Sequence, residues 1–345
     1  MSKPKVAYIR SARLEVLSDD TELSLTKRNL DLVEHDLEVH MVSSEGEIIE
    51  AVKEADLIID EMVPLGKSVI EQMHKAQAIV SLGHGFNHID EKAATDMGIM
   101  LTNCAGYCSD EVANHTIMFL LACSKRLVLL DKLVRNGEWS NETLKSLFPM
   151  PAIYGQTLGL IGFGNIGRHV SRKAKAFGIK VIVFDPYLEP WVSQEYEVQS
   201  MSSLENLGSE SDYISMHVPL NSETKGLADE VLFKNMKSSA YFINTCRGET
   251  HNESALISAL ENKNIAGAAL DVFEIEPTPK DNPLLLMDNV IVSPHSAGTS
   301  DNSRRDGRVR LGEEAARILL GMYPMSLVNS SVKNKIPRRN PAKSL

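Results

Sequence analysis

Three polar side chains that could act on a small acid follow apolar, strand-like runs in the second half of the chain. Arg247 follows the run 242–246, Glu276 comes just after the run 268–273, and His295 follows the run 290–294. In a doubly wound sheet the carboxyl ends of parallel strands form the ligand crevice, so we expect these three groups to meet there.

Their chemical types suggest a division of labour. The planar fork of Arg247 suits a substrate carboxylate and C2 oxygen, His295 can deliver or remove the C2 hydroxyl proton, and Glu276 can hold His295 in one tautomer. Such acid–base help is typically worth about 10²–10⁴ in rate. Spacing alone leaves plainer interpretations open: a helix ion pair for Arg247, a surface acid for Glu276 and an ordinary loop residue for His295.

A glycine-rich turn lies upstream of these groups. The apolar run 158–161 leads into Gly162-Phe163-Gly164-Asn165-Ile166-Gly167, a helical pattern covers 168–177, and a second strand-like run, 181–184, ends on Asp185. This acid lies 18 positions after the last glycine of the motif, close to the roughly 20 typical of a ribose-binding acid. Strand, turn, helix, strand and acid in this order favour a dinucleotide site over a plain glycine turn.

Each residue type in the turn has a physical reason. Gly162 permits the tight turn, Gly164 lets the backbone approach a pyrophosphate, and Gly167 lets the helix pack closely on the strand. The helix start, with the N–H groups of Asn165 and Ile166, would face the phosphates. The acid that ends the second strand can bind the ribose hydroxyls and would repel a 2′-phosphate, so the sequence predicts NAD rather than NADP.

The elements that must position these residues alternate between strand and helix. In the first block we expect short buried strands at 6–9, 38–42, 57–59, 78–82 and 100–101, and helices at 68–75 and 91–97. A long amphipathic helix should then run from Ser109 to about Asn136, followed by a second α/β series over 157–294 and a last helix over 303–321. This alternation predicts the α/β class, with parallel sheets flanked by helices.

Composition limits the other possibilities. A chain of 345 residues with 43% hydrophobic and 24% charged residues fits two globular domains, and a net charge of −10 argues against nucleic-acid binding. The apolar runs are too short for a membrane span or a signal peptide, and the four cysteines lack zinc-site spacing. We therefore expect free thiols, no metal, no membrane contact and a cytoplasmic location. The polar, basic segment 331–345 should be a disordered tail.

Several motifs in order carry a family resemblance, which runs from about Ala78 to Asn329. They are Ser81-Leu82-Gly83-His84-Gly85-Phe86-Asn87-His88-Ile89-Asp90, Thr102-Asn103, Glu111-Val112-Ala113, the glycine turn, Asn244-Thr245-Cys246-Arg247-Gly248, Asp271-Val272-Phe273 with Glu276-Pro277, and Pro294-His295. With them the chain resembles the D-isomer-specific 2-hydroxyacid dehydrogenases. That family includes phosphoglycerate dehydrogenase, glyoxylate/hydroxypyruvate reductase, D-lactate dehydrogenase and the C-terminal-binding-protein corepressors.

The resemblance implies an NAD-dependent dehydrogenase that moves a hydride between nicotinamide and C2 of a small 2-keto/2-hydroxy acid. Arg247 would bind the substrate, Glu276 would orient His295, and His295 would be the acid/base. The backbone around His84 and Gly85 would grip the substrate carboxylate. Further cofactor contacts are implied at His217, Pro219, Thr224, Thr245, Cys246, Arg247, Asp271 and His295.

It also implies a layout. Two Rossmann-like domains would enclose the active site in a cleft between them. The substrate-binding domain would combine residues 1–103 with 303–330, and residues 104–302 would form the NAD-binding domain. Such enzymes are usually homodimers built through the region of the long helix after Ser109.

Some positions depart from the family pattern. His84 stands where a small or aliphatic residue is usual, so it either touches substrate or points to solvent. His251-Asn252 replaces the common Val-Asp pair, and Cys246 replaces an alanine beside the nicotinamide. Tyr107-Cys108 and residues 111–115 are most like the corepressors, which leaves an NAD(H)-sensing binding protein as the alternative function; the chain lacks long flanking extensions suited to transcription partners, which weighs against it.

Overall fold

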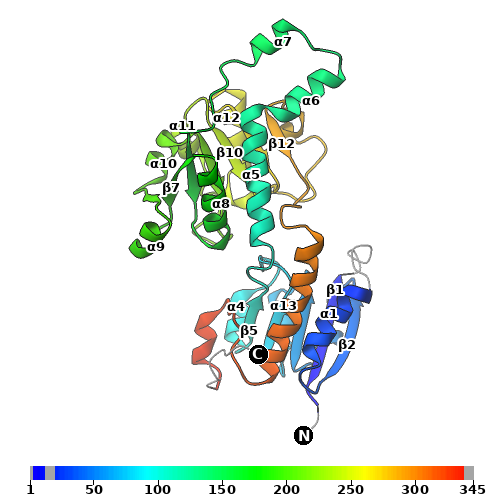
Figure 1. Cartoon of the computed structure of the whole chain (residues 1–345). Coiled ribbons are helices and arrows are strands. Elements are labelled where there is room, and N and C mark those ends of the chain that lie inside the picture. The colour runs from blue at the N-terminus through cyan, green and yellow to red at the C-terminus, as the bar shows by residue number, and fades with distance from the viewer. Residues whose placement is uncertain (1–2, 12–19, 338–345) are drawn as a thin grey trace. The chain divides into compact units, whose positions relative to one another are not determined.

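The computed structural model describes residues 3–11 and 20–337, and its backbone divides into two compact units (Figure 1). The first combines residues 1–108 with 300–345, and the second is 109–299. The boundaries therefore fall at 108/109 and 299/300, where the sequence predicts 103/104 and 302/303. Each unit holds one parallel sheet flanked by helices, which confirms the predicted α/β fold class.

The first unit has a five-stranded sheet of order β2-β1-β3-β4-β5, with every strand pair parallel. This is the doubly wound order whose direction reverses between β1 and β3. The strands are β1 Lys5–Ser11, β2 Asp36–Val42, β3 Leu57–Glu61, β4 Ala78–Ser81 and β5 Met100–Asn103. The helices are α1 Asp20–Leu30, α2 Glu45–Val52, α3 Lys67–Ile70, α4 Glu91–Asp96, α13 Asp301–Leu319 and the 3₁₀ turn η4 Ser330–Asn334.

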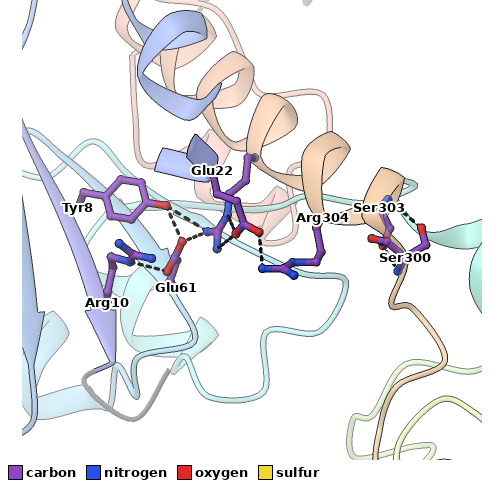
Figure 2. A network of polar contacts seen from close by, with 8 residues as sticks. Tyr8, Arg10, Glu22, Glu61, Ser300, Ser303 and Arg304 are labelled. Carbon is purple, nitrogen blue, oxygen red and sulfur yellow. Dashed lines mark hydrogen bonds and ion pairs between the residues drawn. The ribbon is translucent and has the colours of Figure 1, made fainter. Parts of the chain in front are cut away.

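Both faces of this sheet are buried, which is why its strands read as continuous apolar runs. Along β1 the side chains alternate: Val6 and Tyr8 join the core under α1 and α13, while Ala7 and Ile9 join the core under α2, α3 and α4. Helix α13 begins with a capping box between Ser300 and Ser303 (Figure 2). The last helix of the chain thus completes the core of the first unit.

A polar network lies inside the first unit at the end of β1 and β3 (Figure 2). The Tyr8 hydroxyl donates to Glu61 Oε1 at 2.6 Å, and Arg10 Nε donates to Glu61 Oε2 at 2.9 Å. Arg308 of α13 pairs with Glu61 and with Glu22 of α1, and its Nη1 donates to the Tyr8 hydroxyl at 3.1 Å. Burial raises the pKa of Tyr8, against the lowering effect of the two arginines, so its hydroxyl stays a donor.

The prediction that 331–345 form a disordered tail is wrong for 331–337. Val332 is fully buried in η4, and Lys335 Nζ lies 3.0 Å from Asp96 Oδ1. Asn329, just before η4, accepts from Leu101 N at 2.8 Å and donates to Ile99 O at 2.9 Å. These contacts give the segment a partner surface that its polar composition does not reveal; residues 338–345 lie outside the described part of the chain.

The second unit has a seven-stranded sheet of order β12-β11-β10-β9-β6-β7-β8, also parallel throughout. The strands are β6 Thr157–Ile161, β7 Lys180–Phe184, β8 Gln199–Ser200, β9 Tyr213–Met216, β10 Tyr241–Asn244, β11 Gly267–Leu270 and β12 Val290–Val292. The order reverses between β6 and β9, and a ligand crevice is expected at such a switch point.

Helices cover both faces of this sheet (Figure 1). The helices of the second unit are α5 Ser109–Lys125, α6 Leu127–Arg135, α7 Asn141–Ser146, α8 Asn165–Ala176, α9 Pro190–Glu195, α10 Leu204–Glu210, α11 Glu230–Asn235 and α12 Glu253–Glu261, with 3₁₀ turns η2 Gly248–Thr250 and η3 Pro283–Leu286. One core joins the sheet to α5, α8 and α9, and the other joins it to α10, α11 and α12. Within the described ranges, no helix is long and apolar enough to cross a membrane.

The prediction of one helix from Ser109 to about Asn136 is wrong. Arg126 adopts a left-handed backbone, with φ of 50°, and separates α5 from α6. A residue in this conformation ends a helix because the next N–H turns away from the helix axis. The helical pattern of side chains continues through the break, so periodicity alone could not reveal it.

Candidate functional site

The predicted site residues of the second unit lie at one edge of its sheet. Gly162 follows β6, His217 follows β9, Thr245 follows β10, Asp271 follows β11 and Ser293 follows β12. Because all of these strands are parallel, their carboxyl ends share an edge. The glycine turn stands at the β6/β9 reversal, which is where a doubly wound sheet opens to a ligand.

The glycine turn is shaped for close approach by a ligand. Gly162 has φ of 91°, and a Cβ there would lie 2.6 Å from His217 O, so the turn needs glycine. A Cβ on Gly167 would lie 2.6 Å from Gly162 O, which keeps α8 tight against the turn. At Gly164, by contrast, a Cβ would meet no described atom within 4 Å. Gly164 caps α8 without a side-chain hydrogen bond, so the first N–H groups of the helix, those of Asn165 and Ile166 among them, can serve phosphate oxygens.

Asp185 stands one residue beyond β7 and next to this turn. Its Oδ2 accepts from Phe163 N at 2.8 Å, and its Oδ1 accepts from Tyr187 N at 2.9 Å. A carboxylate has about four acceptor positions, so two remain for ribose hydroxyls. Backbone bonds of this kind fix the carboxylate beside the glycine turn.

His217, Pro219 and Thr224 follow β9. His217 Nε2 lies 3.0 Å from Ser215 Oγ, and its Nδ1 is buried without a partner among the described residues. Burial lowers the pKa of His217 to about 3, so the ring is neutral. Thr224 Oγ1 donates to Pro219 O at 2.5 Å, which closes the exposed turn containing both residues.

Asn244 supports the loop that carries Arg247 through hydrogen bonds to its backbone. Asn244 Nδ2 donates to Arg247 O at 3.0 Å, and Thr250 Oγ1 donates to the same oxygen at 2.7 Å. Cys246 donates to Asn244 Oδ1 through its N–H at 3.0 Å and its Sγ at 3.1 Å. Thr245 is buried and its Oγ1 lies 3.0 Å from Thr116 Oγ1 of α5. The backbone that carries Arg247 is therefore fixed by buried and partly buried hydrogen bonds.

The departure at His251-Asn252 is explained by the same loop. His251 is fully buried, and its Nδ1 lies 2.9 Å from Asn244 Nδ2, so the imidazole extends the support of the arginine loop. Asn252 caps α12 by accepting from Ala255 N at 2.9 Å. The helix start keeps a side-chain cap, and burial lowers the pKa of His251 to about 4.

His295 and Glu276 form a hydrogen-bonded pair. His295 Nδ1 lies 2.6 Å from Glu276 Oε2, and Phe273 N donates to Glu276 Oε1 at 3.0 Å. Partial burial would raise the pKa of Glu276, but these hydrogen bonds and the charges of His295 and Arg247 together hold it below its ordinary value. Glu276 is thus ionised at neutral pH and accepts from the Nδ1 proton, which leaves Nε2 for proton exchange.

Arg247 belongs to the same group of side chains. Gly248 packs so closely that a Cβ there would overlap the backbone of Phe273, which leads to Glu276. The Arg247 charge also contributes to the lowered pKa of Glu276. The three residues predicted to do chemistry therefore lie together at the end of β10, β11 and β12.

The Asp271 carboxylate accepts hydrogen bonds that the sequence does not indicate. This buried carboxylate accepts from Ser296 N at 2.9 Å, from Ala297 N at 2.8 Å and from Ser293 Oγ. These bonds fix the loop around His295, and the predicted contact of Asp271 with the cofactor stays a prediction. Sequence reasoning also missed Ser293 and His115, whose Nε2 lies 3.0 Å from Ser293 Oγ. The sequence feature that could have pointed to His115 is the helix motif 111–115, which served only to indicate the branch of the family.

The predicted substrate residues His84 and Gly85 lie in the first unit, in the loop after β4. His84 Nε2 accepts from Gly106 N at 3.2 Å, and its ring stacks on Tyr107 with centroids 5.5 Å apart. Asn103 Nδ2 donates to His84 O at 2.6 Å. The imidazole thus packs on the segment after β5, and its contact with substrate stays a prediction.

Among the described residues, no group of three or more His, Cys, Asp or Glu side chains could hold a metal ion. None of the four cysteines is in a disulfide; Cys104, Cys108 and Cys123 are buried, and Cys246 is partly exposed.

Comparison with known proteins shows the family. The family model of the D-isomer specific 2-hydroxyacid dehydrogenase NAD binding domain matches residues 117–297. A glyoxylate reductase from Korarchaeum cryptofilum is 35% identical over 314 residues, which cover 89% of this chain and 94% of that protein. The chain belongs to the D-isomer specific 2-hydroxyacid dehydrogenases. The predicted family, reaction class and nicotinamide cofactor are confirmed.

Solved structures share the fold across nearly the whole chain. The PH0520 protein from Pyrococcus horikoshii OT3 aligns with a TM-score of 0.84 and 26% identity over 97% of this chain and 98% of that one. An acyclic imino acid reductase, Bsp5, in complex with NADPH and D-Arg aligns with a TM-score of 0.81 and 28% identity over 94% and 99%. These relatives lend no support to the corepressor alternative; the chain is an NAD(P)-dependent 2-hydroxyacid oxidoreductase.

Proposed function

We propose that this dehydrogenase interconverts a small 2-keto acid and its D-2-hydroxy acid, with Arg247, Glu276 and His295 as the working side chains and with NAD(H) as its cofactor. The observation that carries the proposal is the 2.6 Å pair between His295 Nδ1 and Glu276 Oε2, with the Arg247 charge near enough to help lower the pKa of Glu276. An oriented acid–base pair next to a guanidinium is what reduction of a carbonyl in an anionic substrate requires.

The proposed mechanism follows from the charges. Arg247 binds the substrate carboxylate and C2 oxygen and stabilises the negative charge that builds on that oxygen. The glycine turn and Asp185 would hold the nicotinamide cofactor, which would supply the hydride to C2 or accept it in the reverse direction. His295 Nε2 gives its proton to the C2 oxygen during reduction, and ionised Glu276 stabilises the imidazolium through Nδ1–H. The backbone at His84 and Gly85 would grip the carboxylate.

Glyoxylate is the first substrate to test, since the Korarchaeum cryptofilum relative is a glyoxylate reductase. NADH consumption would be followed at 340 nm with glyoxylate, hydroxypyruvate, pyruvate, phenylpyruvate and oxaloacetate, each beside a His295→Ala variant. We expect turnover on at least one acid and a loss of about 10²-fold or more in the variant. Absence of turnover on every acid, with NADH bound, would contradict the proposed function.

The preference for NAD over NADP is proposed for Asp185. Its carboxylate is fixed beside the glycine turn by Phe163 N and Tyr187 N. Because the Bsp5 relative binds NADPH, the cofactor is set by residues of the individual chain. Asp185→Ala should weaken NADH binding and relax the discrimination against NADPH, measured as the ratio of the two dissociation constants; an unchanged ratio would exclude Asp185 from the ribose site.

We also propose a homodimer formed through α6 and its surroundings, in the reducing cytoplasm where the four free cysteines would persist. In the described structure no residue of α6 is buried, although Leu127, Val128 and Val134 are apolar, and Trp139 beyond it is 77% exposed. An amphipathic helix needs a cover for its apolar face. Light scattering with NADH bound should give twice the chain mass, and Val134→Glu should reduce it; a monomer at micromolar concentration would contradict this.

A further inference from the structure

A histidine outside the proposed acid–base pair reaches the loop that carries His295. His115 lies on α5 with a side chain only 15% exposed, and its ring meets Phe119 edge-on with centroids 4.5 Å apart. Its Nε2 lies 3.0 Å from Ser293 Oγ, and Ser293 Oγ donates to Asp271 Oδ1. A partly buried chain of three side chains therefore runs from α5 to the loop after β12, and it ends on the buried Asp271.

That loop is strained where it carries the imidazole. His295 has φ of 51°, a left-handed conformation that L-residues seldom adopt. Its N–H donates to Asp271 O at 2.7 Å, and the next two N–H groups donate to the Asp271 carboxylate. Strained backbone persists only where its surroundings hold it, and here Asp271 makes the holding contacts.

The direction of the hydrogen bonds fixes the state of His115. The Asp271 carboxylate accepts from two backbone N–H groups, and the Ser293 hydroxyl donates to its Oδ1. The Ser293 oxygen is then left to accept from His115, which places the proton of His115 on Nε2. Burial lowers the pKa of His115, partly offset by the Asp271 charge, so the neutral ring with a proton on Nε2 is the relevant form.

We propose that His115 and Ser293 are positioning residues of the proposed reaction: together they hold the Asp271 carboxylate against the loop and so keep His295 Nε2 aligned with the C2 oxygen of the substrate. In this role neither residue touches the reacting atoms; both act on His295 through Asp271 and the loop. The inference rests on the proposed function, because it assigns the purpose of a loop whose histidine exchanges the proton. Misplacement of a catalytic group by about 1 Å can cost 10²-fold in rate.

The experiment compares His115→Leu, which removes the donor, with His115→Gln, whose amide N–H can reach the place of Nε2. His169→Gln is the matched control, since His169 lies on α8 and bonds to Asp110 at the surface. We expect kcat of His115→Leu to fall about 10- to 100-fold. Its KM and NADH dissociation constant should stay within about twofold, and His115→Gln should recover most of kcat. An unchanged kcat in His115→Leu, or a Gln variant as slow as the Leu variant, would overturn the proposal.

Two further arms keep the outcome interpretable. If His115→Leu fails to fold, Ser293→Ala replaces it with the same expected loss of kcat, and full activity there overturns the proposal. If the wild-type protein turns over no 2-keto acid, the proposed function fails, and NMR of ¹⁵N-histidine-labelled protein tests the positioning alone. The His295 ring signals should then shift in His115→Leu and stay in place in His115→Gln; identical spectra in all three proteins would overturn it.

Discussion

The two units place very different groups at the equivalent point of their sheets. In the first unit the strand order reverses between β1 and β3, where the register partners Arg10 and Glu61 form an ion pair (Figure 2). Arg308 pairs with the same Glu61 carboxylate. In the second unit the order reverses between β6 and β9, where the turn at Gly162 leads to Gly164, at which a Cβ would meet no described atom within 4 Å. Charged side chains of the protein itself occupy the point where the strand order reverses in the first unit. In the second unit this point carries the glycine turn at which a cofactor is expected to bind.

The burial of the charged groups follows the same division. The side chains of Glu61 and Arg308 are 3% and 9% exposed, whereas those of Glu276 and His295 are 34% and 46% exposed. Charges that no substrate can reach act on stability, and charges open to the solvent can act on a substrate. Variants in the two groups should therefore change different measurements.

The largest effect is expected from Arg308→Met in the first unit. Removing one partner of a buried ion pair leaves the Glu61 carboxylate with less compensation, which typically costs about 3–5 kcal/mol. Differential scanning calorimetry should show a lower melting temperature for this unit. Arg304→Met is the matched control, because Arg304 lies on the same helix as Arg308 and pairs with Glu22 of α1, but its side chain is 46% exposed. This variant should cost less than about 1 kcal/mol of stability. Equal losses would contradict the structural role of the buried network.

The next effect concerns pH and the buried His251 of the second unit. Its pKa is lowered from 6.5 to about 4, so below pH 6.5 the unfolded chain binds a proton that the folded chain does not. Stability is therefore lost as the pH falls from about 6.5 to about 4, by about 3 kcal/mol in all. His251→Val should flatten this part of the pH dependence of unfolding, while His169→Gln should leave it unchanged. The slope that remains includes His217, whose pKa is lowered to about 3.

Arg247→Lys should change activity and leave stability alone. Lysine keeps the charge but loses the planar fork, so kcat/KM should fall about 100-fold, the range of one hydrogen bond to a charged group. The melting temperature should change by less than about 2 °C, since two hydrogen bonds to the Arg247 carbonyl, from Asn244 and Thr250, hold the loop in the variant as well. A comparable loss of stability would mean that this charge, like those of the first unit, supports the fold.

The smallest expected effect is an absence of reaction. Burial raises the pKa of Cys104 in the first unit and of Cys123 in the second to about 12. Neither thiol should react with an alkylating reagent at pH 8 in the native protein, as read by mass spectrometry. In rising urea, the cysteine labelled first identifies the unit that opens first; rapid labelling of both without urea would contradict their burial.

Much of this arrangement could be predicted from the sequence, because the apolar runs mark the strands and the motifs follow those strands in a fixed order. The apolar runs gave the first five strands, and the glycine turn followed by Asp185 gave the cofactor-binding sheet. Arg247, Glu276 and His295 could be grouped because each follows a strand of the same parallel sheet. The family resemblance supplied the discontinuous layout, which strand order alone does not contain.

The remaining features depend on contacts between distant segments. Arg126 ends α5 through its backbone conformation, with no change in the apolar pattern to mark it. Val332 packs in a segment that reads as a solvated tail, because its partner surface comes from residues near position 100. His115 and Asp271 are 156 positions apart in the chain, and only the fold brings them to one hydrogen-bonded chain.

The discontinuity of the first unit has a consequence for synthesis on the ribosome. Its core needs α13, where Leu311, Ala315 and Ile318 pack on strands that are made far earlier, from β1 near the start of the chain to β5 at Met100–Asn103. At about 5–20 residues per second, β1 to β5 would wait roughly 10–60 s for that helix, while the contiguous second unit could already fold. The apolar faces that α13 covers would meanwhile be open to chaperones, so the nascent chain should depend on them most before residue 319 leaves the exit tunnel.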